Sequence, residues 1–175
     1  PSRGLGDVYK RQSKCWGRNT NGLLALGRRG TSVGNQKGDM GKNLNEMALG
    51  SEKIAGISSF YNHACANFES GQVKCWGQGR YGALGSGQSK NIGERPSEIG
   101  ENMPYVDLGK NKVVDVQAGE YFTCALFDNK KVKCWGYNYA GQLGYEDVEY
   151  RGDAPNEMGE NLKFVDVGED VKKLE

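Results

Sequence analysis

Five cysteines are the residues of this chain whose type and spacing best suit covalent chemistry. Cys65 and Cys75 lie ten residues apart, and Cys124 and Cys134 repeat that spacing. The spacing fits a β-hairpin with a three-residue loop, in which the two cysteines of a pair lie opposite each other. Opposed residues of a non-hydrogen-bonded pair bring their Cβ atoms close enough for a disulfide. We therefore predict the bridges Cys65–Cys75 and Cys124–Cys134, with small buried thiols as the alternative.

The fifth cysteine, Cys15, would need a partner about ten residues upstream by the same spacing. Residues 1–12 match nothing in the rest of the chain and resemble the translated end of a sequencing library. We expect these residues to be an artefact or a disordered tail, so that truncation leaves Cys15 unpaired. Oxidised pairs would indicate an extracellular, periplasmic or cell-surface location. We expect no zinc site, because the two pairs lack the short ligand spacing that zinc prefers.

Two glycine motifs match known binding or catalytic signatures, but the surrounding sequence lacks the elements that each signature needs. Residues 77–82 read Gly-x-Gly-x-x-Gly, which binds dinucleotides only between a parallel strand and a helix. Residues 30–34 read Gly-x-Ser-x-Gly, a nucleophile elbow that requires a histidine partner. The single histidine, His63, falls in a β-prone run where Phe122 stands sixty residues later, so we expect a packed side chain. We predict no enzyme, no cofactor and no metal.

A tandem repeat supplies the elements that position these residues. The tetrapeptide Lys-Cys-Trp-Gly begins at Lys14, Lys74 and Lys133, at intervals of 60 and 59 residues. A fixed period of this size indicates one supersecondary unit that buries its apolar faces against its neighbours. The copies span residues 14–73, 74–132 and 133–175, and the last is incomplete. We expect the chain to be a fragment of a longer array.

Each copy contains short β-prone runs separated by turn signals. There are four such runs per period, and one of them ends in Cys-Trp-Gly. The other three, each given for two copies, fall at 54–60 and 113–119, at 63–68 and 122–127, and at 105–109 and 164–168. No stretch shows the apolar periodicity of a helix. The expected fold is all-β, an incomplete β-propeller built of four-stranded antiparallel blades.

Each tryptophan of the tetrapeptide ends a strand directly before a glycine. A tryptophan there can bury a large area between blades, while the glycine allows a sharp turn. The residues expected to pack the blades are Trp16, Gly17, Trp76, Gly77, Trp135 and Gly136.

The order Lys-Val, Ala-Gly, Thr-Cys-Ala-Leu, Val-Lys-Cys-Trp-Gly and Gly-Gln-Leu-Gly over residues 112–144 resembles the regulator of chromosome condensation repeat family. The resemblance covers residues 13–175 and implies a parent propeller of seven blades. Known members include nucleotide exchange factors for a nuclear small GTPase, propellers attached to ubiquitin ligases, and secreted inhibitors of β-lactamase. The shared fold does not select among these roles.

The leading interpretation is a non-catalytic protein-binding scaffold that contacts its partner through rim loops at 28–37, 86–95 and 145–153. The alternatives are a guanine-nucleotide exchange factor for a small GTPase, or a propeller regulatory domain of a larger enzyme. The tyrosines expected to act as interface anchors are Tyr137, Tyr139, Tyr145 and Tyr150.

Composition narrows the class of partner. The net charge is +1, which gives no basic field for nucleic acid. No apolar run approaches the ~18–20 residues of a membrane-spanning helix. We expect a protein partner, and a monomer when the array is complete.

Overall fold

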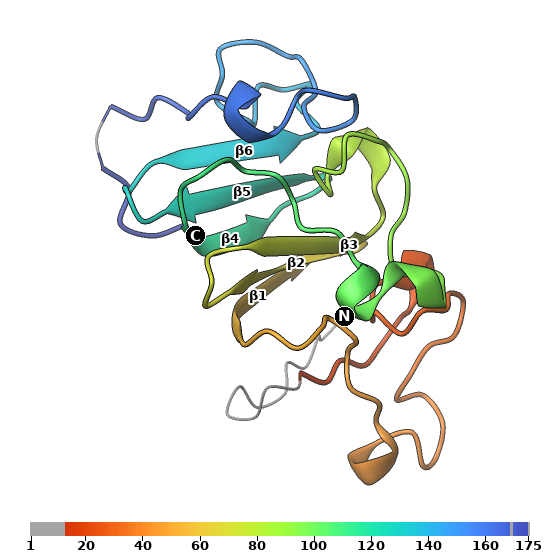
Figure 1. Ribbon diagram of the computed structural model, residues 1–175. Helices are drawn as coiled ribbons and strands as arrows, with labels where there is room; N and C mark the ends of the chain where they lie inside the picture. Colours follow the sequence, from red (N-terminus) through yellow and green to blue (C-terminus); the bar gives the residue numbers. More distant parts are fainter. Residues whose placement is uncertain (1–12, 169, 175) are drawn as a thin grey trace.

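A computed structural model describes residues 13–168 and 170–174 of the 175-residue chain (Figure 1). It is all-β, with two three-stranded antiparallel sheets in which strands adjacent in sequence are adjacent in space. The first sheet contains β1 (Ile54–Phe60), β2 (His63–Phe68) and β3 (Val73–Gly77). The second contains β4 (Val113–Ala118), β5 (Phe122–Phe127) and β6 (Val132–Gly136). The all-β class predicted from the sequence is therefore confirmed.

The connecting segments carry single turns of 3-10 helix. In the described residues these are η1 (Thr20–Gly22), η2 (Gly41–Asn43), η3 (Arg80–Gly82), η4 (Pro96–Glu98), η5 (Gly100–Asn102) and η6 (Gly159–Asn161). None of the helices in this part of the chain has the length and apolar character needed to cross a bilayer.

The run at 105–109 does not form a full fourth strand. Val106 N–H donates to Val73 O at 2.8 Å, and Val165 N–H donates to Val132 O at 2.8 Å in the next copy. Beyond Val106 the backbone has other partners: Asp107 O accepts from Gly159 N–H, and Gly109 N–H donates to the Asp107 carboxylate. The ladder to β3 ends after one bond because these groups already have hydrogen-bond partners, Gly159 of the next copy and the Asp107 side chain.

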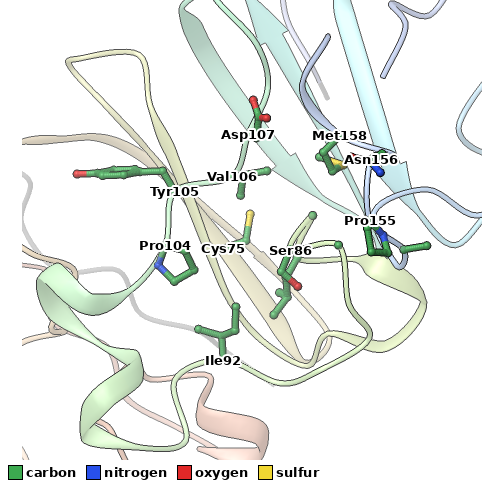
Figure 2. A pocket seen from close by; sticks show the side chains of 14 residues that line it. Cys75, Ser86, Ile92, Pro104, Tyr105, Val106, Asp107, Pro155, Asn156 and Met158 are labelled. Carbon is green, nitrogen blue, oxygen red and sulfur yellow. The ribbon is translucent and has the colours of Figure 1, made fainter. Parts of the chain in front are cut away.

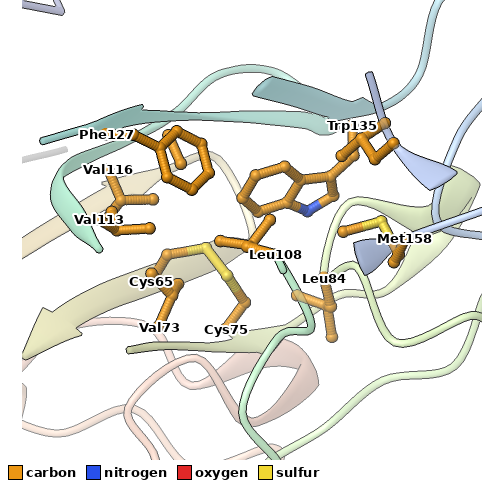
Figure 3. Packing of buried hydrophobic residues seen from close by; sticks show 12 residues of the cluster. Cys65, Val73, Cys75, Leu84, Leu108, Val113, Val116, Phe127, Trp135 and Met158 are labelled. Atoms are coloured by element: carbon orange, nitrogen blue, oxygen red, sulfur yellow. A yellow bond between two sulfur atoms is a disulfide. The ribbon is translucent and has the colours of Figure 1, made fainter. Parts of the chain in front are cut away.

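The two sheets pack face to face over a shared apolar core (Figure 3). Trp135 is fully buried there, and its indole N–H donates to Ala83 O at 3.1 Å. Trp76 makes the equivalent bond to Leu23 O at 2.9 Å, one copy earlier. Both tryptophans thus link a strand to the turn of the preceding copy. Trp16 is only half-buried and lines a cavity of about 260 Å³ with Cys15.

The glycine after each tryptophan has a positive φ: 113° at Gly17, 99° at Gly77 and 109° at Gly136. A Cβ at Gly77 would clash with the backbone of Asn62, and one at Gly136 with the backbone of Tyr121. These two positions therefore require glycine both for the left-handed turn and for the close approach of the neighbouring hairpin.

The lysine of the tetrapeptide is buried in the second and third copies, which was not predicted from the sequence. Lys133 is 3% exposed and its ammonium donates to Leu108 O at 3.0 Å and Gly159 O at 2.8 Å. Lys74 is 1% exposed and donates to Leu49 O and Gly100 O in the same way. Burial lowers the pKa of both amines, although nearby carboxylates oppose the shift. Each lysine thus joins its sheet to two loop carbonyls.

A hairpin turn offers a test of backbone conformation. Lys130 has φ 64°, whereas the equivalent residue of the first hairpin is Gly71, with φ 88°. Left-handed backbone is costly for a residue with a Cβ, and the exposed Lys130–Asp170 ion pair contributes little. We expect Lys130→Gly to raise the free energy of unfolding by about 0.5–1 kcal/mol, measured by urea denaturation. The reverse exchange, Gly71→Lys, should destabilise; equal signs for the two variants would contradict the explanation.

Candidate functional site

The four cysteines predicted to form bridges lie in the two sheets. Cys65 on β2 is joined to Cys75 on β3, and Cys124 on β5 is joined to Cys134 on β6, each pair with Cα atoms 4.1 Å apart. The two members of each pair are direct register partners. Cys65 and Cys75 are buried between the sheets, so that this bridge belongs to the core.

His63 is a buried structural residue. Its Nε2 lies 3.0 Å from Thr123 Oγ1 on the neighbouring sheet, and that hydroxyl donates to Ala83 O at 2.9 Å. The Thr123 oxygen therefore accepts from His63 Nε2–H, which fixes the tautomer. The sequence Gly-x-Ser-x-Gly at 30–34 lies in a different copy, in an exposed loop. The ring is thus committed to packing between the sheets.

A cavity of about 270 Å³ lies beside β3, among the loops at 84–87, 104–107 and 154–158 (Figure 2). Its lining is mostly apolar, and Figure 2 shows Val106 and Met158 on one side with Ile92 and Cys75 on the other. Asp107 is the carboxylate of this lining, and it already accepts a hydrogen bond from Gly109 N–H. The cavity offers no acid–base pair among the described residues.

Six tyrosines have rings in mutual contact and form a continuous aromatic surface. They belong to the segments at the edge of the sheets where β3 and β6 end, an edge that can be followed in Figure 1. We call this surface the tyrosine strip. Its neighbouring rings have centroids 4.7–6.4 Å apart, in edge-to-face, tilted or stacked arrangements. Such spacing is typical of favourable aromatic pairs. Its members are Tyr61, Tyr81, Tyr121, Tyr137, Tyr139 and Tyr150.

Turns from both sheets bring the strip together. Tyr61 lies between β1 and β2, Tyr121 between β4 and β5, and Tyr81 within η3. Their φ angles are 51°, 61° and 60°, a region that bulky residues rarely adopt. Strained backbone of this kind concentrates at functional sites, where surrounding structure holds it.

Tyr81 lies in the middle of the strip. Its ring contacts those of Tyr121, Tyr137 and Tyr150, with centroid distances of 5.6, 4.7 and 5.3 Å. The two ends are open to solvent: Tyr139 is 72% exposed and Tyr61 is 52% exposed. Burial among the rings raises the pKa of the Tyr121 phenol. The strip is therefore a partly desolvated surface with exposed ends.

Tyr145 does not belong to the strip, although it was expected among the interface anchors. Its hydroxyl donates to Lys163 O at 2.9 Å and accepts from Cys134 N–H at 3.1 Å. The Arg151 guanidinium lies 4.1 Å from its ring centroid and pairs with Asp147. Tyr145 thus fastens its loop to β6, because its polar tip is used inside the fold.

Half of the strip was not predicted from the sequence, namely Tyr61, Tyr81 and Tyr121. One signal was available, since Tyr61 and Tyr121 lie sixty residues apart, one repeat period, in corresponding turns. Ring contacts between different copies are not encoded in that spacing. Only the packing of one sheet on the other brings the rings together.

Comparisons with known proteins agree with this architecture. The pattern described as the regulator of chromosome condensation (RCC1) repeat matches residues 70–126 and, in a second form, residues 113–142. The chain is 34% identical over 119 residues to the probable E3 ubiquitin-protein ligase HERC6 of Homo sapiens, covering 68% of this chain and 10% of that protein. It is 33% identical over 148 residues to the ultraviolet-B receptor UVR8 of Arabidopsis thaliana, covering 83% and 30%.

Solved structures show the same fold at lower identity. Human WBSCR16 superposes with a TM-score of 0.62 at 19% identity, covering 84% of this chain and 33% of that one. Prp20p of Saccharomyces cerevisiae superposes with a TM-score of 0.53 at 23% identity, covering 86% and 34%. The chain thus spans about a third or less of each protein named here. With its repeat pattern, its sheets and these relatives in agreement, the chain belongs to the regulator of chromosome condensation repeat family.

Proposed function

We propose that this chain is part of a non-catalytic scaffold that binds a protein partner at one rim of a propeller. The tyrosine strip carries the proposal. Tyrosine is enriched at binding hot spots because it offers a large rigid surface with a polar tip. The strip joins turns from two sheets, and rigid sheets are the usual support for binding loops.

The relatives support a role in protein binding. Yeast RCC1 (Prp20) has been solved with Kap60 bound, and Prp20p of Saccharomyces cerevisiae has binding properties toward Gsp1p and histones. These partners belong to those proteins, and a shared fold does not transfer a partner. They make a protein partner the natural first class to test.

We further propose that the parent protein is a propeller of seven blades, with repeats at residues 14–73, 74–132 and 133–175. Each of the runs at 105–109 and 164–168 is held to its sheet by one backbone hydrogen bond and would form a shortened fourth strand of a blade. The two cysteine pairs support an oxidising location, either extracellular, periplasmic or cell-surface.

Site-specific cross-linking tests the proposed function. Tyr139 is replaced by the photo-reactive amino acid benzoylphenylalanine, and the chain is irradiated in extract from its source cells. We expect one predominant cross-linked protein, because Tyr139 is the most exposed end of the strip.

The matched control places the same reagent at Val114, which is 51% exposed near the start of β4, at the opposite end of the sheet. The control should give little of that product. Equal yields at both positions, or no product at position 139, would reject the rim as the binding surface.

A further inference from the structure

Arg80 provides an example, within the chain, of a cation on the tyrosine strip. Its guanidinium carbon lies 4.5 Å from the centroid of the Tyr81 ring, and the side chain is exposed. The negative face of an aromatic ring attracts a cation placed over it. Among the described residues, Arg80 is the cation found over the rings of the strip. The faces of the other rings have the same character.

Carboxylates border the strip. Glu120 is exposed and directly precedes Tyr121. The pKa of the Tyr150 phenol is raised by burial and by neighbouring charges, among them that of the Asp153 carboxylate. Asp153 itself carries a raised pKa, caused by burial and by the charge of Glu157. A surface of ring faces bordered by carboxylates favours a positively charged partner, both in the contact and in the encounter.

The shape of the strip favours an extended ligand. The rings follow one another from Tyr61 through Tyr121 and Tyr81 to Tyr137 and Tyr139, across the ends of both sheets. A row of this kind can contact several successive side chains of one peptide segment, whereas a single compact group would meet only two or three rings. Extended segments docked on aromatic surfaces are a recurrent recognition mode.

We infer that the tyrosine strip binds an extended basic segment of a partner protein, with arginine or lysine side chains over the ring faces and close to Glu120 and Asp153. The inference rests on the proposed function, because it names the chemistry of the partner at the same surface. Arg80 holds the face of Tyr81, so the partner's cations would occupy the more exposed rings at the two ends, Tyr61 and Tyr139.

Fluorescence anisotropy with a defined probe tests the inference. The probe is a dye-labelled Gly-Ser peptide with arginine at every third position, and its counterpart carries glutamine instead. We expect the arginine peptide to bind the 175-residue chain at low salt and the glutamine peptide not to bind. Tyr139→Leu and Tyr61→Leu should each weaken binding by about two- to fivefold, the effect of one exposed cation–π contact.

Paired substitutions distinguish ring chemistry from apolar area. Tyr139→Phe and Tyr61→Phe keep the ring face, so their affinity should stay within about twofold of the original. Equal losses in the Phe and Leu variants would assign the contact to the hydroxyl and overturn the inference. Tyr105→Leu is the control, since Tyr105 lies outside the strip, beside the Lys74 ammonium, and should not change binding.

The outcomes separate this inference from the proposed function. Binding of the glutamine peptide as tight as that of the arginine peptide, or no binding of either, overturns the basic partner. Cross-linking at position 139 would then still support the rim as the binding surface. If neither Leu substitution changed the affinity for the arginine peptide, its binding site would lie elsewhere, and the inference would also be overturned. Self-association of the chain, blocked by Tyr139→Leu, would identify a second copy as the occupant and contradict it.

Discussion

Replacing Lys133 with methionine is expected to lower the free energy of unfolding by about 3 kcal/mol or more. The substitution removes two charge-assisted hydrogen bonds, and each such bond contributes roughly 1.5–3 kcal/mol. It also leaves Leu108 O and Gly159 O without their ammonium donor. Methionine recovers part of the loss because it fills the space without burying a charge.

Urea denaturation of the purified chain measures this effect. Lys131→Met is the matched control, because Lys131 is the exposed neighbour in sequence and surface changes alter stability by about 0.5 kcal/mol or less. Lys74→Met should match Lys133→Met, since Lys74 makes the same two bonds one copy earlier. A loss from Lys133→Met no larger than the control would mean that the buried amine is dispensable.

The difference in the free energy of unfolding between the original chain and Lys133→Met should depend on pH. Burial lowers the pKa of Lys133 below the value of about 10.5 that applies to the unfolded chain. Between the two pKa values the unfolded state binds more protons, so raising the pH stabilises the folded chain through this group. The stability advantage of the original chain over Lys133→Met should therefore grow as the pH rises through the lowered pKa toward 10.5.

The second large effect is expected from the disulfides. Replacing Cys65 and Cys75 together with alanine should lower the free energy of unfolding by about 2–3 kcal/mol, because the bridge closes a loop of about ten residues in the unfolded chain. The Cys124–Cys134 bridge closes a loop of the same length and should contribute similarly. Reduction of both bridges should thus cost about 5 kcal/mol.

Denaturation with and without dithiothreitol measures the contribution of the bridges. The Cys15→Ser variant is the control and should keep the full response to the reductant, since Cys15 belongs to neither pair. Alkylation of the native chain under non-reducing conditions provides an independent check by intact mass. Four alkylated thiols at the paired positions would contradict both bridges.

The strands and the register of the cysteines could be predicted from the sequence because local patterns encode them. The runs at 54–60, 63–68 and 122–127 coincide with β1, β2 and β5. The ten-residue spacing placed Cys65 opposite Cys75, and the structure has that register. The length of the outer strand predicted at 105–109 was overestimated. The residues after Val106 form hydrogen bonds with a side chain and a distant loop, which no pattern in that run reveals.

Only half of the candidate site could be predicted from the sequence. Tyr137, Tyr139 and Tyr150 were identified from their crowding near one loop, whereas Tyr145 was grouped with them although its hydroxyl holds that loop to β6. Crowding in sequence cannot distinguish a side chain that faces solvent from one that turns inward. That distinction depends on backbone direction at each turn.

By itself the sequence determined the repeat, the six strands of the two sheets, the cysteine pairs and the strand-end positions of Trp76 and Trp135, because these depend on local periodicity and on hairpin length. Only the tertiary structure decided which residues of different copies meet. The burial of Lys74 and Lys133 and the union of six tyrosines depend on how one sheet lies against the next. Packing between copies brings together residues that lie up to about one repeat apart in the sequence. Their side chains form a single surface only in the folded array.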